Sequence, residues 1–274
     1  MINKLFNLFG LQISYKKKAS VISFHDDYDK KINYEYENEA NELIKIVRKN
    51  TMLPFVNLVT LYEQVLFCET HNIEGDFVEC GVWKGGAVGL MAAANLKLSK
   101  NRRDLHLFDV FDDICAPDEK VDGKRAINEM KQILGAAAGT KGELLPQKGI
   151  YDSFGGHGTI DACNDLIKNK IAYPADNIIF HKGWFQDTLP ADSKLIKKIA
   201  ILRLDGDWYA STKICLDYLF DKVVPGGFII IDDYGLYSGC RKAVDEFLHG
   251  KKEQYFFNYS SWSCRYIIKK PSID

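Results

Sequence analysis

The sequence lacks the signals of several common protein classes. None of its seven cysteines pairs as Cys-x-x-Cys, so neither a zinc knuckle nor a disulfide framework is indicated, and a reducing, cytoplasmic location is favoured. No apolar run approaches the roughly 20 residues of a membrane span. The formal net charge is only -1 across 274 residues, whereas nucleic-acid-binding domains usually carry a basic face. We therefore expect no nucleic-acid partner, and one large globular domain with at most an appendage.

The N-terminus also lacks the order of a secretory signal peptide. An apolar stretch over residues 1–11 precedes the lysines at 16–18 instead of following them, and no small-residue cleavage site is present. A short amphipathic helix in peripheral membrane contact and a packed terminal segment both fit this pattern. We divide the chain into a partly helical N-terminal extension (1–50) and a main domain (51–274), and we expect the extension to make the contacts of a homo-oligomer.

What the sequence does contain is an alternation of predicted strands and helices. Strands are predicted at 76–80, 105–109, 178–181, 199–204 and 228–231, and helices at 36–49, 54–71, 86–98, 211–221 and 239–248. This order predicts an α/β fold with a doubly wound, mostly parallel sheet.

The end of the chain departs from that alternation. Two consecutive strands, 254–259 and 264–269, predict a C-terminal antiparallel hairpin, which fits a class I methyltransferase core better than a plain dinucleotide-binding domain. Residues 114–158 are predicted to be irregular, and they form either a lid over the ligand edge of the sheet or a surface loop.

Two of the predicted strands end in carboxylates. Asp205 and Asp207 follow the strand 199–204, and Asp232 and Asp233 follow the strand 228–231. In open α/β sheets, ligands bind at the carboxyl ends of the strands. Carboxylate oxygens suit a hard divalent cation such as Mg²⁺ or Ca²⁺, so the pattern predicts a metal site at this edge.

A glycine-rich turn, Glu79-Cys-Gly-Val-Trp-Lys-Gly-Gly86, follows the first strand. Glycines let a ligand approach the backbone and the amides of a helix N-terminus. The pattern is not Gly-x-Gly-x-x-Gly, so a dinucleotide cradle is not supported. Glu79 places a negative charge there, which suits the sulfonium and amino groups of S-adenosylmethionine. A tight turn that caps a helix is the alternative.

Two further strand ends offer groups for a nucleoside. Asp109 ends the second strand and can accept hydrogen bonds from ribose hydroxyls, whereas Asp112 and Asp113 are expected to cap a helix or face solvent. The segment 183–190 supplies aromatic surface for an adenine. The candidate cofactor-binding residues are Glu79, Gly81, Trp83, Gly85, Gly86, Asp109, Phe111, Gly183, Trp184 and Phe185.

Five segments in order resemble the macrocin O-methyltransferase family, metal-dependent enzymes that methylate sugar hydroxyls on antibiotics. They are Thr51-Met52 and the segments 75–86, 183–190, 202–212 and 226–234, and the resemblance covers residues 50 to 250. It implies a class I fold with a seven-stranded sheet, S-adenosylmethionine as cofactor, bound Mg²⁺ and a small-molecule or glycan acceptor. Residues 1–35 and 116–158 do not match, which leaves the acceptor open.

By matched position, the resemblance implies that Asp205, Asp232 and Asp233 bind the metal and that Asp207 is the general base. The metal would bind two adjacent oxygens of a sugar diol and lower the pKa of the acceptor hydroxyl. His181, at a strand end, and His157, in the predicted lid, are alternative bases. Arg203 faces away from Leu202 and Leu204 and could pair with one of the carboxylates or form only a salt bridge with a helix. Candidates for acceptor binding are Tyr209, Tyr234 and Tyr237.

Two other functions remain open at this stage. A catechol or phenol O-methyltransferase would use the same cation to chelate adjacent phenolic oxygens. A protein that binds S-adenosylmethionine only as a scaffold would not need the carboxylates at both strand ends.

Overall fold

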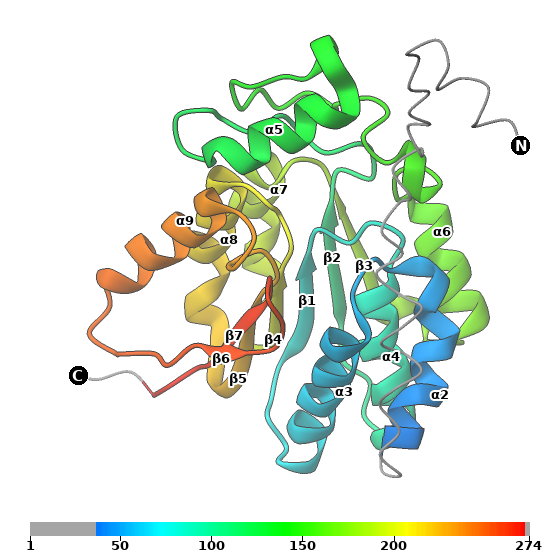
Figure 1. Cartoon of the computed structure of the whole chain (residues 1–274). Coiled ribbons are helices and arrows are strands. Elements are labelled where there is room, and N and C mark those ends of the chain that lie inside the picture. Colours follow the sequence, from blue (N-terminus) through cyan, green and yellow to red (C-terminus); the bar gives the residue numbers. More distant parts are fainter. Residues whose placement is uncertain (1–36, 272–274) are drawn as a thin grey trace, which may run out of the picture. The chain divides into compact units, whose positions relative to one another are not determined.

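The computed structural model describes residues 37–271, and its centre is a seven-stranded sheet (Figure 1). The strand order is β3-β2-β1-β4-β5-β7-β6. In chain order the strands are β1 (Asp76–Cys80), β2 (Leu105–Asp109), β3 (Ile178–Lys182), β4 (Ile199–Leu204), β5 (Val223–Ile231), β6 (Asn258–Tyr259) and β7 (Arg265–Ile268). The first five are parallel, whereas β7 is antiparallel to both β5 and β6. The predicted doubly wound sheet with a terminal antiparallel pair is therefore confirmed.

Helices cover both faces of the sheet, as a buried parallel sheet requires. One layer contains α2 (Asn38–Val47), α3 (Phe55–Thr70) and α4 (Gly86–Leu98), with α6 (Ile160–Asn164) and a π-helical turn (165–170) beside α4. The other contains α7 (Phe185–Asp192), α8 (Tyr209–Leu219) and α9 (Ser238–His249). One more helix, α5 (Gly123–Leu134), crosses above the carboxyl ends of the strands in Figure 1.

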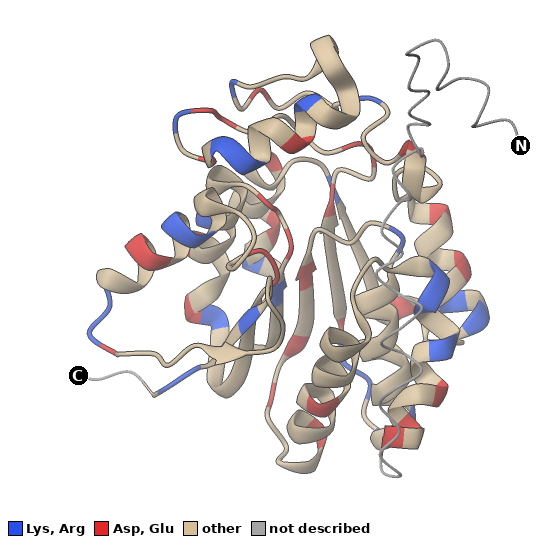
Figure 2. Ribbon diagram, viewed as in Figure 1, with Lys and Arg blue, Asp and Glu red and all other residues tan. Residues whose placement is uncertain are grey.

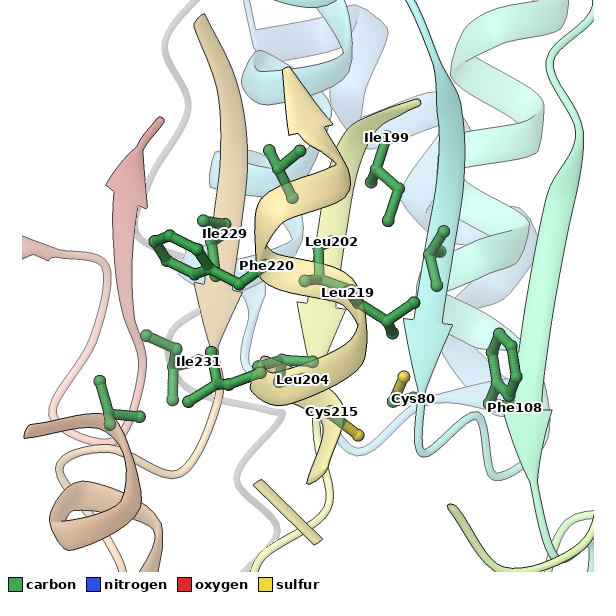
Figure 3. Close-up of a cluster of buried hydrophobic side chains, with 14 of the residues drawn as sticks. Cys80, Phe108, Ile199, Leu202, Leu204, Cys215, Leu219, Phe220, Ile229 and Ile231 are labelled. Atoms are coloured by element: carbon green, nitrogen blue, oxygen red, sulfur yellow. The ribbon is translucent and has the colours of Figure 1, made fainter. Parts of the chain in front are cut away.

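Successive side chains along each strand point to opposite faces of the sheet, so the core is divided between the two helical layers. Figure 3 shows the side of the sheet that faces α8, where Leu202, Leu204 and Ile229 pack against Cys215 and Leu219. These side chains are fully or almost fully buried. Residue 203, between two of these leucines, faces the α3 layer instead. The sheet thus sends one charged side chain of β4 to the opposite face from its neighbours.

The structure corrects three of the predicted elements. The predicted strand 254–259 is paired only at β6, and the predicted strand 228–231 begins five residues earlier, because β5 spans Val223–Ile231. The region expected to be irregular contains α5, whose apolar face Ala126, Ile127 and Met130 is buried. In addition, α2 packs on α3 and α4, so residues 38–47 of the predicted extension pack together with the main domain.

The remaining predictions about the N-terminus lie outside the described residues, including the membrane contact of residues 1–18. Between residues 37 and 271, no helix combines the length and apolar character needed to cross a membrane. All seven cysteines are buried free thiols.

Candidate functional site

The loops after β1 and β4 lie against each other at the carboxyl end of the sheet. Gly81 has φ +90°, and a Cβ added there would lie 1.8 Å from the carbonyl oxygen of Asp205. The backbone N–H of Asp205 donates to the carbonyl of Cys80 (2.8 Å), and that of Asp232 donates to the carbonyl of Leu204 (3.0 Å). Only glycine fits at position 81. The close approach of the two backbones there places Asp205 beside the glycine-rich turn.

Three carboxylates converge at this edge, as the sequence predicts. One oxygen each from Asp205, Asp232 and Asp233 lies within 4.8 Å of the other two. Opposite ligands of an octahedral Mg²⁺ lie about 4.2 Å apart, because each Mg–O bond is about 2.1 Å long. The donor set and its spacing therefore fit a hard divalent cation.

A single buried arginine connects these acids. The side chain of Arg203 is 3% exposed, and its Nη1 lies 2.7 Å from Glu79 Oε1 and 2.8 Å from Asp205 Oδ2. Its Nη2 lies 2.9 Å from Asp232 Oδ1. The pairing suggested from the strand alternation is confirmed. A buried charge requires such partners, and here one cation serves three carboxylates from β1 and the ends of β4 and β5.

Negative charge remains in excess after Arg203 is counted. Burial, with repulsion from neighbouring aspartates, raises the pKa of Asp207 and of Asp233 well above the usual range. Burial also raises the pKa of Asp232 to about 6 and that of Glu79 to about 8, although Arg203 opposes both shifts. Acidic segments, red in Figure 2, lie between the upper end of the sheet and α5. A bound cation would relieve this repulsion.

The backbone is strained at the same edge. The non-glycine residues with positive φ between residues 37 and 271 are Asn72, Trp83, Phe111, Ala172 and Asp207. Three of them, Trp83, Phe111 and Asp207, lie in the loops after β1, β2 and β4. Strain of this kind persists only where surrounding contacts hold it, and it concentrates at ligand sites. For Asp207, one such contact is the hydrogen bond from its N–H to Asp233 Oδ2 (3.3 Å).

Two predicted cofactor ligands use their oxygens to hold the loops. Glu79 is 1% exposed, and its Oε2 accepts a hydrogen bond from the Val88 N–H (2.8 Å) while Oε1 contacts Arg203. Asp109 Oδ2 accepts from the N–H groups of Val82 (2.7 Å) and Trp83 (3.0 Å). These contacts tie Glu79 to the first turn of α4 and Asp109 to the glycine-rich turn, a role that the sequence pattern does not predict.

The other predicted cofactor residues lie in this turn and in the loops after β2 and β3. Asp109 Oδ1 accepts from the N–H of Phe111 (2.6 Å), and the Phe111 ring meets Phe180 edge-on. Gly85 (φ +82°) is the N-cap of α4, and a Cβ on Gly86 would lie 2.5 Å from Thr51 Cβ. The loop after β3 contains Gly183 (φ +149°) and leads into α7. Trp184 is the N-cap of this helix, and Phe185 is its first residue. The structure thus gathers the predicted cofactor residues in three loops at one end of the sheet.

An aromatic and acidic wall faces the carboxylates from the α5 side. The Tyr237 hydroxyl donates to Glu129 Oε2 (2.7 Å), and its ring lies 5.0 Å from Trp208. Burial, followed by repulsion from Asp207, raises the pKa of both Tyr237 and Tyr151 above the usual range. Tyr237 was predicted as an acceptor residue, whereas Glu129 and Tyr151 were not, because no recognisable motif marks α5 or the loop after it.

The two other predicted acceptor residues turn toward α9. The hydroxyl of Tyr209 donates to Glu246 (2.7 Å) and that of Tyr234 to Asp245 (2.7 Å). The Tyr234 ring also stacks on Phe257. Their hydroxyls are therefore directed at acids of α9 and not at the carboxylates that converge at the end of the sheet.

The two alternative bases also lie elsewhere. His181 is 3% exposed and stacks on Phe108, and its ring nitrogens contact His106 (3.0 Å) and Asp192 (2.9 Å). Its strand, β3, is three strands from β4, or about 14 Å at the usual strand spacing. His157 lies 3.9 Å from Asp112 Oδ1. The structure brings neither histidine to the carboxylates.

Asp112 and Asp113 are the remaining acids that the sequence singled out. Asp112 pairs with Lys148, whereas Asp113 is 5% exposed and accepts a hydrogen bond from the Gly149 N–H. The expectation that Asp113 caps a helix or faces solvent is therefore wrong, because the loop that follows α5 covers it.

Comparisons with known proteins identify relatives that match most of the chain. The family described as Macrocin-O-methyltransferase (TylF) matches residues 29–147 and 169–267. The 8-demethyl-8-(2,3-dimethoxy-alpha-L-rhamnosyl)-tetracenomycin-C 4'-O-methyltransferase of Streptomyces olivaceus is 31% identical over 70% of this chain. The alignment spans 63% of that protein, which is less than two thirds of its length. Demethyldecarbamoylnovobiocin O-methyltransferase of Streptomyces niveus is 31% identical over 72% of this chain and 67% of its own.

Among solved structures, the O-methyltransferase NovP has the same fold. It superposes with a TM-score of 0.64 at 26% sequence identity, and the superposition covers 81% of this chain and 83% of NovP. This similarity confirms the predicted class I methyltransferase fold.

Proposed function

This chain belongs to the macrocin O-methyltransferase family, and from that premise we propose that it transfers a methyl group from S-adenosylmethionine to a sugar hydroxyl. The acceptor would be a glycosylated natural product or glycan. The observation that carries the proposal is the convergence of Asp205, Asp232 and Asp233 beside Asp207. The names of two relatives, which describe methylation of a rhamnosyl tetracenomycin and of demethyldecarbamoylnovobiocin, support this class of acceptor.

The proposed metal is Mg²⁺, with Asp205, Asp232 and Asp233 as its protein ligands. Three carboxylate oxygens within 4.8 Å form a hard-donor set, and burial together with repulsion from neighbouring aspartates raises the pKa of Asp232 and of Asp233. When bound, Mg²⁺ would act as a Lewis acid that lowers the pKa of the acceptor hydroxyl. Arg203 keeps two of the three ligands oriented through its contacts with Asp205 and Asp232.

The donor would lie against the glycine-rich turn and the loops after β2 and β3. An ionised carboxylate offers about four acceptor positions, and Asp109 uses three of them for backbone N–H groups. One position is thus left for a ribose hydroxyl. Glu79 is too deeply buried for direct contact with a ligand, so its contribution would be to hold Arg203 and the start of α4.

Asp207 is the proposed general base. Its raised pKa brings it closer to that of an activated hydroxyl than an ordinary carboxylate would be. In the reaction, a carboxylate oxygen of Asp207 takes the hydroxyl proton and the acceptor oxygen bonds to the methyl carbon. The carbon–sulfur bond breaks with its electron pair going to sulfur. Tyr237, Glu129 and Tyr151 lie on the side from which an acceptor would approach.

The test is a methyl-transfer assay with labelled S-adenosylmethionine and a panel of deoxysugar glycosides and catechols. We expect glycosides to be methylated, activity to be lost in EDTA and added Mg²⁺ to restore it. Methylation of catechols alone would replace the sugar acceptor by a phenol. Tight binding of S-adenosylmethionine without transfer to any acceptor would favour a scaffold, and full activity in EDTA would exclude the metal.

A further inference from the structure

A small cavity with several polar groups in its lining lies behind the carboxylates, between α3 and the sheet. It is lined on one side by Asn57, Thr60 and Gln64 of α3, and on the other by Arg203 and Asp232. The space open to the centre of a water molecule is about 10 Å³, which is close to what one water needs. The cavity thus reaches the side of the ion-pair cluster opposite to the proposed substrates.

The α3 side chains bring polar atoms into this cavity without protein partners. Gln64 is 4% exposed, and neither its Oε1 nor its Nε2 has a hydrogen-bond partner among residues 37–271. Asn57 is 5% exposed, and its Nδ2 is unpaired within the same range, although its Oδ1 accepts from Ser260 Oγ (3.2 Å). Residues 57 and 64 lie seven positions apart, about two helical turns, and therefore share a face. Buried amides without any partner are costly and rare in folded proteins.

Arg203 brings to the same place a nitrogen that has an ion pair but no contact with hydrogen-bond geometry. Its Nη2 lies 2.9 Å from Asp232 Oδ1, but the angle is not that of a hydrogen bond, and no partner with hydrogen-bond geometry is present in the described part of the chain. The cavity thus joins two α3 amides to the guanidinium that orients Asp205 and Asp232. None of these atoms can reach another directly with good geometry, but a small molecule between them could contact several.

We propose that this cavity binds an ordered water molecule that links Gln64 and Asn57 to Arg203 Nη2. Water fits because it can donate to Gln64 Oε1 and accept from Asn57 Nδ2 or Arg203 Nη2. An anion would be repelled by Asp232, and a cation by Arg203 and the amide N–H groups. Gln64 and Asn57 are then positioning residues, which hold Arg203 and through it the carboxylates Asp205 and Asp232.

The evidence for the water site is the cavity and the polar atoms in it that lack hydrogen bonds. Its effect on metal binding rests, in addition, on the proposed function. The test therefore uses three measurements on the full chain. They are a crystal structure that resolves water, the melting temperature, and the Mg²⁺ dissociation constant from calorimetry. The variant is Gln64→Met, which keeps the side-chain length and removes the amide. The control is Thr60→Val, because the Thr60 hydroxyl lines the same cavity but donates within α3 to the Val56 carbonyl (2.8 Å).

We expect density for a water within hydrogen-bond distance of Gln64 and Arg203. Gln64→Met should lower the melting temperature by about 3 °C and weaken Mg²⁺ binding by about tenfold, the low end of effects from residues behind metal ligands. Thr60→Val should leave the Mg²⁺ dissociation constant within about twofold, as expected for a residue outside that network.

Two results would overturn the inference. A cavity without water density, together with a higher melting temperature for Gln64→Met, would mean that the amide is simply unpaired, since replacing such a group by an apolar one stabilises a protein. A bound water with unchanged Mg²⁺ affinity in Gln64→Met would remove the positioning role. If the wild-type protein itself binds no Mg²⁺, the proposed function fails, whereas the water density and melting temperature still decide the water site.

Discussion

Two buried polar clusters in the same sheet invite comparison. The histidine cluster (His106, His181 and Asp192) lies at β2, β3 and α7, and the carboxylate cluster (Arg203 with Glu79, Asp205, Asp207, Asp232 and Asp233) lies at the ends of β1, β4 and β5. Each histidine contact has a protein partner at hydrogen-bond distance. In the carboxylate cluster, several acids share one guanidinium. Both clusters therefore bury polar or charged side chains. Only the carboxylate cluster has converging oxygens and more acids than its one cation can pair, and these are the features of a site that would bind a ligand.

The largest expected effect concerns the need for the carboxylate cluster in catalysis. Replacing Asp232 by Asn removes a proposed metal ligand and a partner of Arg203. A metal that acts as a Lewis acid contributes several kcal/mol, so we expect the rate of methyl transfer to fall by about 10³-fold or more. Steady-state kinetics at saturating Mg²⁺ measures this. An Asp232→Asn enzyme with wild-type kcat would show that this carboxylate binds no essential metal.

A smaller loss is expected at Asp207. The substitution Asp207→Asn keeps the shape of the side chain but cannot take a proton, so we expect kcat to fall by about 10²-fold. Binding of Mg²⁺ and S-adenosylmethionine should persist, which calorimetry would check. Normal turnover in this variant would mean that another group removes the proton.

The charge imbalance also predicts how the metal-free protein responds to pH. Burial raises the pKa of Asp232 from 3.8 to about 6, so the folded state binds a proton more tightly than the unfolded state. The stabilisation is present at low pH and is lost as pH rises through about 6, and it amounts to about 3 kcal/mol. Urea unfolding between pH 4 and 8 measures this.

The matched control is Asp232→Asn, which should flatten that slope. Added Mg²⁺ should stabilise the wild-type protein more at pH 8 than at pH 5, because protons compete with the metal. A metal-free wild type whose stability falls no more than that of Asp232→Asn between pH 4 and 8 would contradict the raised pKa of Asp232.

The smallest effect is expected in the histidine cluster. His181→Phe would leave buried His106 without its partner, which should cost about 1–2 kcal/mol of unfolding free energy. The ratio kcat/KM should change less than twofold, because residues outside the reacting site rarely affect the chemical step. Urea denaturation and kinetics on the same preparation separate the two. A large loss of kcat at unchanged stability would return His181 to the list of bases.

The parts of the fold that were predictable are those whose signal is local. The predicted bounds of β1, β2 and β4 coincide with the observed ones, because each is an apolar run that a glycine or an aspartate ends. The convergence of the carboxylates was predictable for the same reason, since the ends of parallel strands share one edge.

The parts that were not predictable depend on distant contacts. The helix α5 has only three buried apolar residues and is bordered by glycines. Glu129 meets Tyr237 across 108 positions of the chain, a contact that no local pattern encodes. Glu79 was correctly placed at the strand end, but only the fold shows that Arg203 and the start of α4 occupy both of its oxygens.

The positive φ angles of Trp83, Phe111 and Asp207 have a consequence for protein engineering. A left-handed backbone costs a non-glycine residue about 1–2 kcal/mol, so glycine would relieve local strain at Asp207, whereas at Phe111, which is 6% exposed, the lost burial would exceed that gain. These are also the loops that hold the glycine-rich turn, the Asp109 contacts and Asp207. A search for thermostable variants would therefore encounter its easiest gains where rigidity of the loops matters most for turnover, and selection for heat resistance alone would tend to erode the enzyme.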